Sequence, residues 1–198
     1  LLRYLTLIGV SPIVLPPDAT LEQVMAERPA GVIISGGPGD PTQAAPTLAL
    51  LRDLVARHAA GPTCTPGDQR LPTDAAGAPS LFGIGLGLQL IALTLGARLA
   101  ALPVGHRAAN VPVLDLASGR IEITAHNHLY AIDPASLGRL PLAVTHTNLN
   151  DGSIEGLRHA DWPITGVQFQ PEASPGPHDS LHLLHEFIMT LPEHMSHA

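Results

Sequence analysis

The chain has little cysteine and few basic residues. It holds one cysteine in 198 residues, and Lys and Arg number 10 against 17 Asp and Glu. A single cysteine excludes an internal disulfide, which suits a reducing compartment. A formal net charge of −7 argues against a nucleic-acid partner, because such surfaces need clustered basic residues. The sequence shows no cationic N-terminal segment followed by an apolar run and a cleavage site, so we expect no secretory signal. We therefore expect a cytoplasmic protein.

An uninterrupted apolar run long enough for a membrane span is also lacking. Residues 81–104 form the most apolar stretch, and a span needs about 20 residues. Gln89, Arg98, Pro103 and several glycines interrupt this stretch. Such a pattern favours a buried strand followed by a helix. We expect no membrane partner.

Short apolar runs alternate with amphipathic segments in the first half of the chain, and the second half is rich in strand patterns. This order predicts an α/β fold with a mainly parallel central sheet and helices on both faces. Predicted helices cover residues 2–7, 21–26, a segment capped by Thr42, and 181–191. Predicted strands cover residues 12–15, 31–34, 81–84, 111–114, 120–124, 142–147, 154–158 and 164–169.

Gly85 stands at the tip of a predicted strand-to-helix elbow, Leu-Phe-Gly-Ile-Gly-Leu-Gly-Leu-Gln over residues 81–89. In α/β hydrolases such an elbow raises one nucleophilic side chain above the sheet. Glycine supplies no side chain, so the pattern predicts a catalytic scaffold without its attacking atom. A dinucleotide fingerprint is excluded by spacing, because Leu88 or Leu90 stands where its last glycine belongs.

The elbow resembles that of class I glutamine amidotransferases, Gly-Ile-Cys-Leu-Gly-x-Gln. In that family the Cys attacks the glutamine amide, and a downstream His-Pro-Glu run completes the triad. Here the corresponding run is Gln170-Pro171-Glu172. The resemblance implies a flavodoxin-like α/β domain in which Gly85 replaces the Cys, Gln170 replaces the His and Glu172 is retained.

These replacements remove the chemistry of acyl transfer. Glycine has no nucleophile, and a glutamine amide does not titrate near neutral pH as histidine does. Loss of a triad nucleophile costs on the order of 10⁶ in turnover. We predict a pseudo-glutaminase.

Four later runs resemble motifs of one subfamily, the small subunit of carbamoyl-phosphate synthetase. Residues 105–113 read Gly-His-Arg-Ala-Ala-Asn-Val-Pro-Val, and residues 124–128 read Thr-Ala-His-Asn-His, where the subfamily has Thr-x-Gln-Asn-His. Residues 148–157 and 172–179 match its Asn-Leu-Asn-Asp-Gly and Glu-Ala-Ser-Pro-Gly-Pro-His-Asp runs. The resemblance covers nearly the whole chain. It implies a large ATP-dependent synthetase subunit as the partner and no cofactor.

The resemblance also implies a relic of the substrate site. Gly37, in a loop Ser-Gly-Gly-Pro-Gly-Asp-Pro, and Leu86 would supply the oxyanion N–H groups. Gln89 and Asn127 would hold the substrate. Leu129 and Tyr130 stand where the family has Gly-Phe, and the bulk of Leu129 leaves glutamine binding open.

The resemblance further implies one glutamine amidotransferase-like domain over residues 1–198, with a further strand and a whole N-terminal domain of the family preceding Leu1. Residues 59–78, rich in Pro and Gly, read as an inserted surface loop. Two alternatives remain: an active amidase with a relocated nucleophile, Cys64 or Ser35, and a truncated relic without a partner.

The eleven histidines are expected to be packed or on the surface rather than to bind a metal. His126 and His128 alternate on an extended segment, so both can share one face. His182 and His185 are spaced for one helix face. A metal needs three or four converging ligands, and the sequence alone does not fix that convergence. A base role for His128 would lack a nucleophile to activate.

Overall fold

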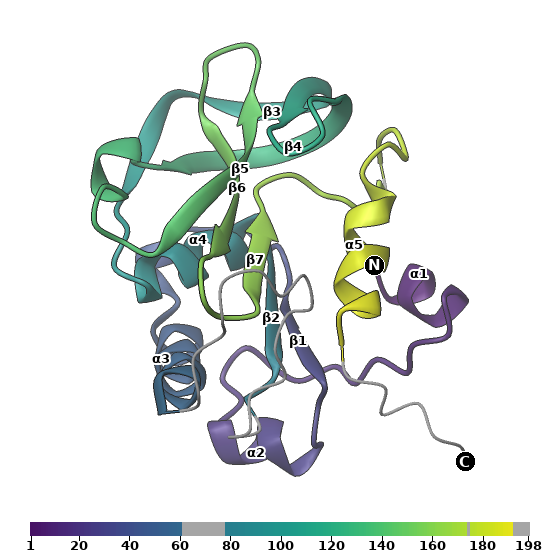
Figure 1. Ribbon diagram of the computed structural model, residues 1–198, viewed down its shortest axis with the longest axis vertical. Helices are drawn as coiled ribbons and strands as arrows, with labels where there is room; N and C mark the ends of the chain where they lie inside the picture. Colours follow the sequence, from purple (N-terminus) through teal and green to yellow (C-terminus); the bar gives the residue numbers. More distant parts are fainter. Residues whose placement is uncertain (61–77, 174, 192–198) are drawn as a thin grey trace.

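The computed structural model describes residues 1–60, 78–173 and 175–191 (Figure 1). Its helices are α1 (Leu2–Leu7), α2 (Leu21–Ala26), α3 (Ala45–Ala60), α4 (Leu86–Thr94) and α5 (Leu181–Met189), with short 3₁₀ turns η1 (Pro41–Gln43) and η2 (Pro134–Ser136). Its strands are β1 (Gly31–Ile34), β2 (Ser80–Ile84), β3 (Leu99–Asp115), β4 (Ile121–Ile132), β5 (Leu142–Asn148), β6 (Ile154–His159) and β7 (Ile164–Val167). They form one sheet in the order β1-β2-β7-β6-β4-β3-β5.

Strands β1, β2 and β7 run parallel and carry helices on both faces. In Figure 1, α3 and α4 lie on one side of these strands, and α1 and α5 lie on the other. Alternate residues of β2 explain this arrangement: Leu81 joins the apolar cluster under α3 and α4, whereas Phe82 packs with Phe187 of α5. The predicted α/β class with helices on both faces is confirmed here.

The remaining pairings among the described strands are antiparallel, so the sheet is mixed, and the prediction of a mainly parallel sheet holds only for β1, β2 and β7. Strands β3, β4, β5 and β6 each pair with two others of the four and close a circuit. Short connections such as residues 116–120 produce this pattern, because they can join antiparallel strands but not parallel ones.

Several predicted boundaries were wrong. Residues 12–15 form no strand, and Ile13 and Val14 are exposed. Thr42 lies in η1, capped by the carboxylate of Asp40, and the following helix begins at Ala45. Helix α3 continues through Ala60, so the predicted loop cannot begin at residue 59. Residues 61–77 of that loop lie outside the described chain.

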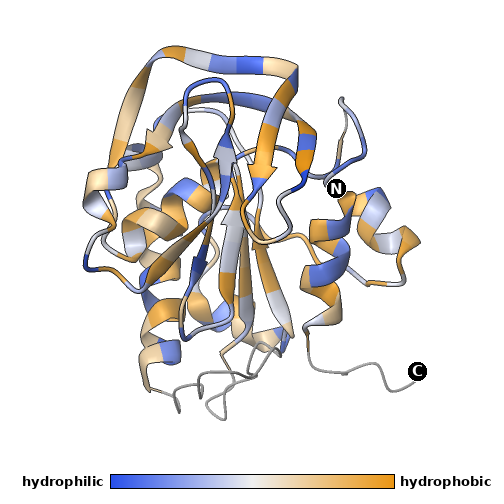
Figure 2. Cartoon of the chain, turned by 45° about the horizontal axis from the view of Figure 1, so that its top comes forward, coloured by the Kyte–Doolittle hydropathy of each residue, from blue (hydrophilic) through white to orange (hydrophobic). Residues whose placement is uncertain are grey.

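Apolar residues follow the central strands and the flanking helices (Figure 2). The apolar stretch 81–104 divides into β2, α4 and the start of β3. Among the described helices, none has both the length and the apolar character that crossing a bilayer requires.

Candidate functional site

The elbow between β2 and α4 forms as the sequence predicts. Gly85 has φ 55° and ψ −113°, a region that favours glycine and that nucleophile elbows occupy under strain. Its N–H donates to the Val167 carbonyl at 2.8 Å, and its carbonyl accepts from the Gln89 N–H at 3.2 Å. The tip is therefore fixed between β7 and the first turn of α4.

The tip has room for a side chain. A Cβ atom built on Gly85 would lie 3.5 Å from the Gln168 carbonyl oxygen and 3.8 Å from the Gly36 Cα, which are ordinary contact distances. By contrast, a Cβ on Gly87 would lie 1.9 Å from the Ile34 carbonyl oxygen. Gly87 is thus needed for packing, whereas Gly85 leaves space where a nucleophile would project.

A cleft of about 330 Å³ opens beside the elbow. Its lining includes the predicted oxyanion residues Gly37 and Leu86 and all four predicted substrate residues. The full lining is Gly37, Pro38, Gly39, Asp40, Leu86, Gln89, Arg107, Asn127, His128, Leu129 and Tyr130. A Cβ on Gly37 would lie 3.3 Å from Leu86 Cδ2, so the loop after β1 touches the elbow. The structure brings these six residues together, and their roles stay predictions.

Strand β4 presents different residues on its two faces. Asn127 and Leu129 are exposed toward the cleft, and Leu129 keeps 41% of its surface accessible. His126 precedes Asn127 and His128 lies between Asn127 and Leu129, and both histidines are buried. This alternation follows from the two-residue period of a strand. It confirms that the two histidines share a face.

Gln89 is buried within the fold. Its Nε2 donates to the Tyr130 carbonyl at 2.9 Å and to Gln168 Oε1 at 3.1 Å. Both amide hydrogens therefore tie α4 to β4 and to the segment after β7. A ligand in the cleft would have to compete with these bonds for the amide N–H groups.

Gln170 and Glu172 follow β7, the neighbour of β2. Ile84 is in register with Val167, so this segment leaves the sheet at the same edge as the elbow. The Gln170 N–H donates to the Ala125 carbonyl at 2.9 Å, and both side chains are half-buried. Neither residue, nor Gly85, contributes to the described lining of the cleft.

The proposed relocated nucleophiles differ in what the structure says of them. Ser35 is exposed directly after β1, in the loop that approaches the elbow. Cys64 lies outside the described residues.

The two histidines of α5 lie apart from the cleft lining. His182 bonds to Glu122 and Glu186 through its two ring nitrogens at 2.5 and 3.0 Å, and His185 is exposed.

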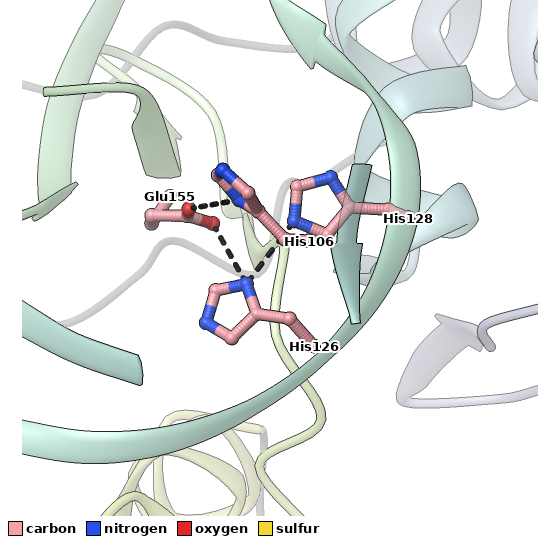
Figure 3. A group of neighbouring side chains, drawn as sticks. All are labelled: His106, His126, His128 and Glu155. Carbon is pink, nitrogen blue, oxygen red and sulfur yellow. Dashed lines mark hydrogen bonds and ion pairs between the residues drawn. The ribbon is translucent and has the colours of Figure 1, made fainter. Parts of the chain in front are cut away.

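A second group of polar side chains lies behind the cleft, and one of its members, His128, also lines the cleft. His106 of β3, His126 and His128 of β4, and Glu155 of β6 point toward one another (Figure 3). One donor atom from each lies within 4.8 Å of all the others. Sequence patterns missed this group, because His106 and Glu155 belong to separate motifs that only the strand pairing brings together.

Burial governs the ionisation of this group. It lowers the pKa of His126 to about 3 and the pKa of His128 to about 4, helped by the positive charge of neighbouring histidines. It raises the pKa of Glu155 to about 8 against the hydrogen bonds from Asn148 and Ser153. Without a bound cation, neutral forms are therefore favoured at pH 7.

Comparisons with known proteins agree with this architecture. Residues 1–190 match the family model described as glutamine amidotransferase class-I. The chain is 40% identical over 175 residues to the carbamoyl phosphate synthase pyrimidine-specific small chain of Lactiplantibacillus plantarum, covering 88% of this chain and 42% of that protein. It is 41% identical over 193 residues to the carbamoyl phosphate synthase small chain of Staphylococcus epidermidis, covering 98% and 47%. The chain thus spans about half the length of these curated relatives.

Solved structures share the fold. A candidate GMP synthase subunit of Thermoplasma acidophilum superposes with a TM-score of 0.74 at 19% identity, covering 95% of this chain and 84% of that one. A glutamine amidotransferase of Thermotoga maritima superposes with a TM-score of 0.50 at 16% identity, covering 71% and 56%. At these identities the likeness concerns the fold alone.

Proposed function

The chain belongs to the class I glutamine amidotransferase family, and we propose that it is the glutaminase-like domain of a carbamoyl-phosphate synthetase small subunit that no longer hydrolyses glutamine. We propose that residues 1–198 form one such domain, with the segment around residues 61–77 as an insertion. The domain would dock on the large ATP-dependent subunit, as a scaffold or regulator, while free ammonia supplies the nitrogen.

The observation that carries this proposal is the residue at the elbow. Gly85 keeps the strained backbone of a nucleophile elbow and the space for a side chain, yet it has no atom that could attack an amide. Gln170, at the position of the base, cannot accept a proton near pH 7. A cleft with two backbone donors could still polarise a carbonyl, but it could not form a covalent acyl intermediate.

Glutamate release from glutamine by the purified chain tests the loss of activity. We expect release at the level of the buffer control, with no change after treatment with a thiol-alkylating reagent. Robust release would overturn the proposal. The variants Cys64→Ala and Ser35→Ala would then show whether either residue is the nucleophile.

Restoring the side chains gives a second, independent test. The double variant Gly85→Cys, Gln170→His should gain a covalent glutamyl adduct, detected by mass spectrometry, because a Cβ at Gly85 meets no close atom. The matched control Gly85→Ala, Gln170→His has the same backbone strain but no thiol, so it should form none. An adduct on the unmodified chain would contradict the assignment of Gly85.

Co-purification with the large synthetase subunit encoded in the same genome tests the partner. We expect a complex on size-exclusion chromatography whose carbamoyl phosphate synthesis uses ammonia and is not increased by glutamine. Absence of any complex would favour a relic without a partner.

A further inference from the structure

The four side chains behind the cleft come from three strands of the closed circuit β3-β4-β5-β6. His106 is directly opposite His128 in the β3–β4 register, and Ala108 is opposite His126. Because residues two apart in a strand share a face, all three imidazoles project to the same side. Glu155 of β6 meets them there, with its side chain fully buried. The strand register, rather than chance surface proximity, brings the donors together.

The hydrogen bonds around each imidazole leave one nitrogen lone pair facing inward. The Thr124 hydroxyl donates to the Val111 carbonyl at 2.9 Å, so it accepts from His126 Nε2 at 2.7 Å. This bond fixes the proton of neutral His126 on Nε2 and leaves the lone pair on Nδ1. Such outer bonds are what orients a metal-binding histidine.

His128 and His106 are held in the same manner. His128 Nδ1 donates to the Tyr130 carbonyl at 2.9 Å, which leaves the lone pair on Nε2. His106 Nε2 lies 3.0 Å from Asp151 Oδ2, so it carries the proton and Nδ1 is the inward atom, to which Asn148 Nδ2 can donate only a long bond of 3.5 Å. Each histidine therefore has an outer acceptor, a hydroxyl, a backbone carbonyl or a carboxylate.

The inward atoms face one another without enough protons between them. His126 Nδ1 lies 3.1 Å from His128 Nε2, and with the tautomers above both are acceptors. Glu155 Oε1 accepts from Asn148 and Ser153. Its Oε2 accepts no hydrogen bond from any described residue, although it is buried, and it lies 3.6 Å from His126 Nδ1. A proton on Glu155, which burial favours, could pair with only one of these inward acceptors, whereas one cation at their centre would pair with all of them.

We propose that His106, His126, His128 and Glu155 bind one zinc ion. Imidazole nitrogens and a carboxylate oxygen are ordinary zinc ligands, and a tetrahedral site separates its ligand atoms by about 3.3 Å. His126 Nδ1 lies 3.1 Å from His128 Nε2 and 3.6 Å from Glu155 Oε2, and His106 Nδ1 lies 3.5 Å from Glu155 Oε1, which are close to this value. With one ligand atom from each residue, all four atoms lie within 4.8 Å of one another, so small side-chain shifts would close the tetrahedron. The carboxylates of Glu155 and Asp151 balance the two positive charges of the ion.

The site is structural rather than catalytic. Four protein ligands complete a tetrahedron and leave no position for water or substrate. The side chain of His106 is 15% exposed and His128 lines the cleft, whereas the side chains of His126 and Glu155 are fully buried. A zinc ion here would lock β3, β4 and β6 together behind the cleft. It would thereby hold Asn127 and Leu129, which project from the opposite face of β4.

Direct metal analysis of the tag-free 198-residue chain tests the proposal. After dialysis against a chelator, the chain should bind one Zn²⁺ in a competition titration, with a Kd below about 10⁻⁷ M. A hundredfold excess of free Zn²⁺ over the Kd should raise Tm by about 5–10 °C. Cobalt in place of zinc should give the visible spectrum of a tetrahedral site. Failure to bind one equivalent at micromolar zinc would overturn the proposal.

Matched variants locate the site. His126→Gln introduces the residue that the resembled motif Thr-x-Gln-Asn-His carries, so the variant should fold, yet its zinc affinity should fall at least about 100-fold, since outer-bond losses alone cost 10–100-fold. Thr124→Val should weaken binding by about 10–100-fold through the outer bond. His146→Gln changes a buried histidine of β5 outside the group and should leave affinity unchanged.

The zinc affinities of these variants distinguish the proposed site from a site elsewhere in the chain. Zinc binding that is equally tight in His126→Gln, or equally weakened in His146→Gln, would place the ion elsewhere and refute the assignment. If His126→Gln does not fold by circular dichroism, Glu155→Gln and the wild-type titration decide. None of these readouts depends on glutaminase activity, so the inference stands or falls separately from the proposed function.

Discussion

Substitution of alanine at two neighbouring glycines should have very different effects on stability. At Gly85 the added Cβ meets no atom closer than 3.5 Å, and the only cost is its positive φ of 55°. Such backbone strain costs about 1–3 kcal/mol. At Gly87 the added Cβ would lie 1.9 Å from the Ile34 carbonyl oxygen and 2.7 Å from its carbon. These are backbone atoms of β1, which cannot rotate away.

Gly87→Ala should therefore destabilise the domain by more than about 4 kcal/mol, a range reserved for such clashes. The steric cost itself would be larger than this destabilisation, because alanine in a helix is favoured over glycine by about 1 kcal/mol and offsets part of it. Urea unfolding of both variants beside the wild type measures the difference. For a domain of this size each kcal/mol shifts Tm by about 2–4 °C.

The result bears directly on the proposal that Gly85 replaces a nucleophile. If Gly85→Ala is as damaging as Gly87→Ala, then the fold itself requires glycine at the tip and the argument from available space is refuted. If Gly85→Ala is mild, as we expect, the loss of a side chain there is not imposed by packing. Gly85→Cys should then be as stable as Gly85→Ala.

Three further predictions concern other parts of the domain. Partial burial lowers the pKa of His182, but hydrogen bonds to Glu122 and Glu186 raise it by more. The protonated His182 should therefore add at most about 1 kcal/mol to the free energy of unfolding below pH 6.5. This contribution should be lost as the pH rises through the raised pKa. Comparing unfolding of the wild type and His182→Gln at pH 6 and pH 9 checks this, and a gap that widens at pH 9 would contradict it. Gln89→Leu leaves Gln168 Oε1 without its donor and removes one of the two donors of the Tyr130 carbonyl, which keeps His128 Nδ1, so it should cost about 1–3 kcal/mol in urea unfolding, and a neutral effect would refute that role. Leu129→Gly removes an exposed side chain from the cleft. It should cost about 0.5–1 kcal/mol and strengthen glutamine binding in calorimetry, whereas unchanged binding would show that Leu129 is not the obstacle.

Most helices and strands could be predicted because the spacing of apolar residues within a short segment is enough to indicate them. The elbow is the clearest case, since glycine spacing over residues 81–89 fixed both the turn and its tip. The wrong strand at residues 12–15 shows the limit: Ile13 and Val14 are β-branched residues that favour a strand, but none of the described strands pairs with them. Strand β3 extends far beyond residues 111–114 for the opposite reason. Its pairing with β4 on both sides of a register irregularity, at Ala101 and at His106, carries the strand through Pro103 and Gly105, which a local pattern assigns to a loop.

The histidine group needed information that no single motif contains. His126 and His128 could be assigned to one face from their spacing, as the structure confirms. Their meeting with His106 depends on the β3–β4 register, which shifts between Ala101 and His106 and again between Ala108 and Val111. A shift of one residue would turn His106 to the other face. Because irregularities of this kind arise from tertiary packing, the convergence could not be read from the sequence.

Under the proposed function, loss of the nucleophile and retention of the cleft have different physical consequences. Removing a side chain from the tip of the elbow leaves its backbone bonds to Val167 and Gln89 in place, so the scaffold can persist when its chemistry is gone. The group of three histidines and Glu155 is different, because replacing one member with an apolar residue would leave the others with unpaired acceptors in a largely buried interior. Selection for a stable docking domain would then act on His106, His126, His128 and Glu155 even where it no longer acts on glutamine hydrolysis. Within this group we expect the fold to tolerate a polar replacement, such as His126→Gln, better than an apolar one.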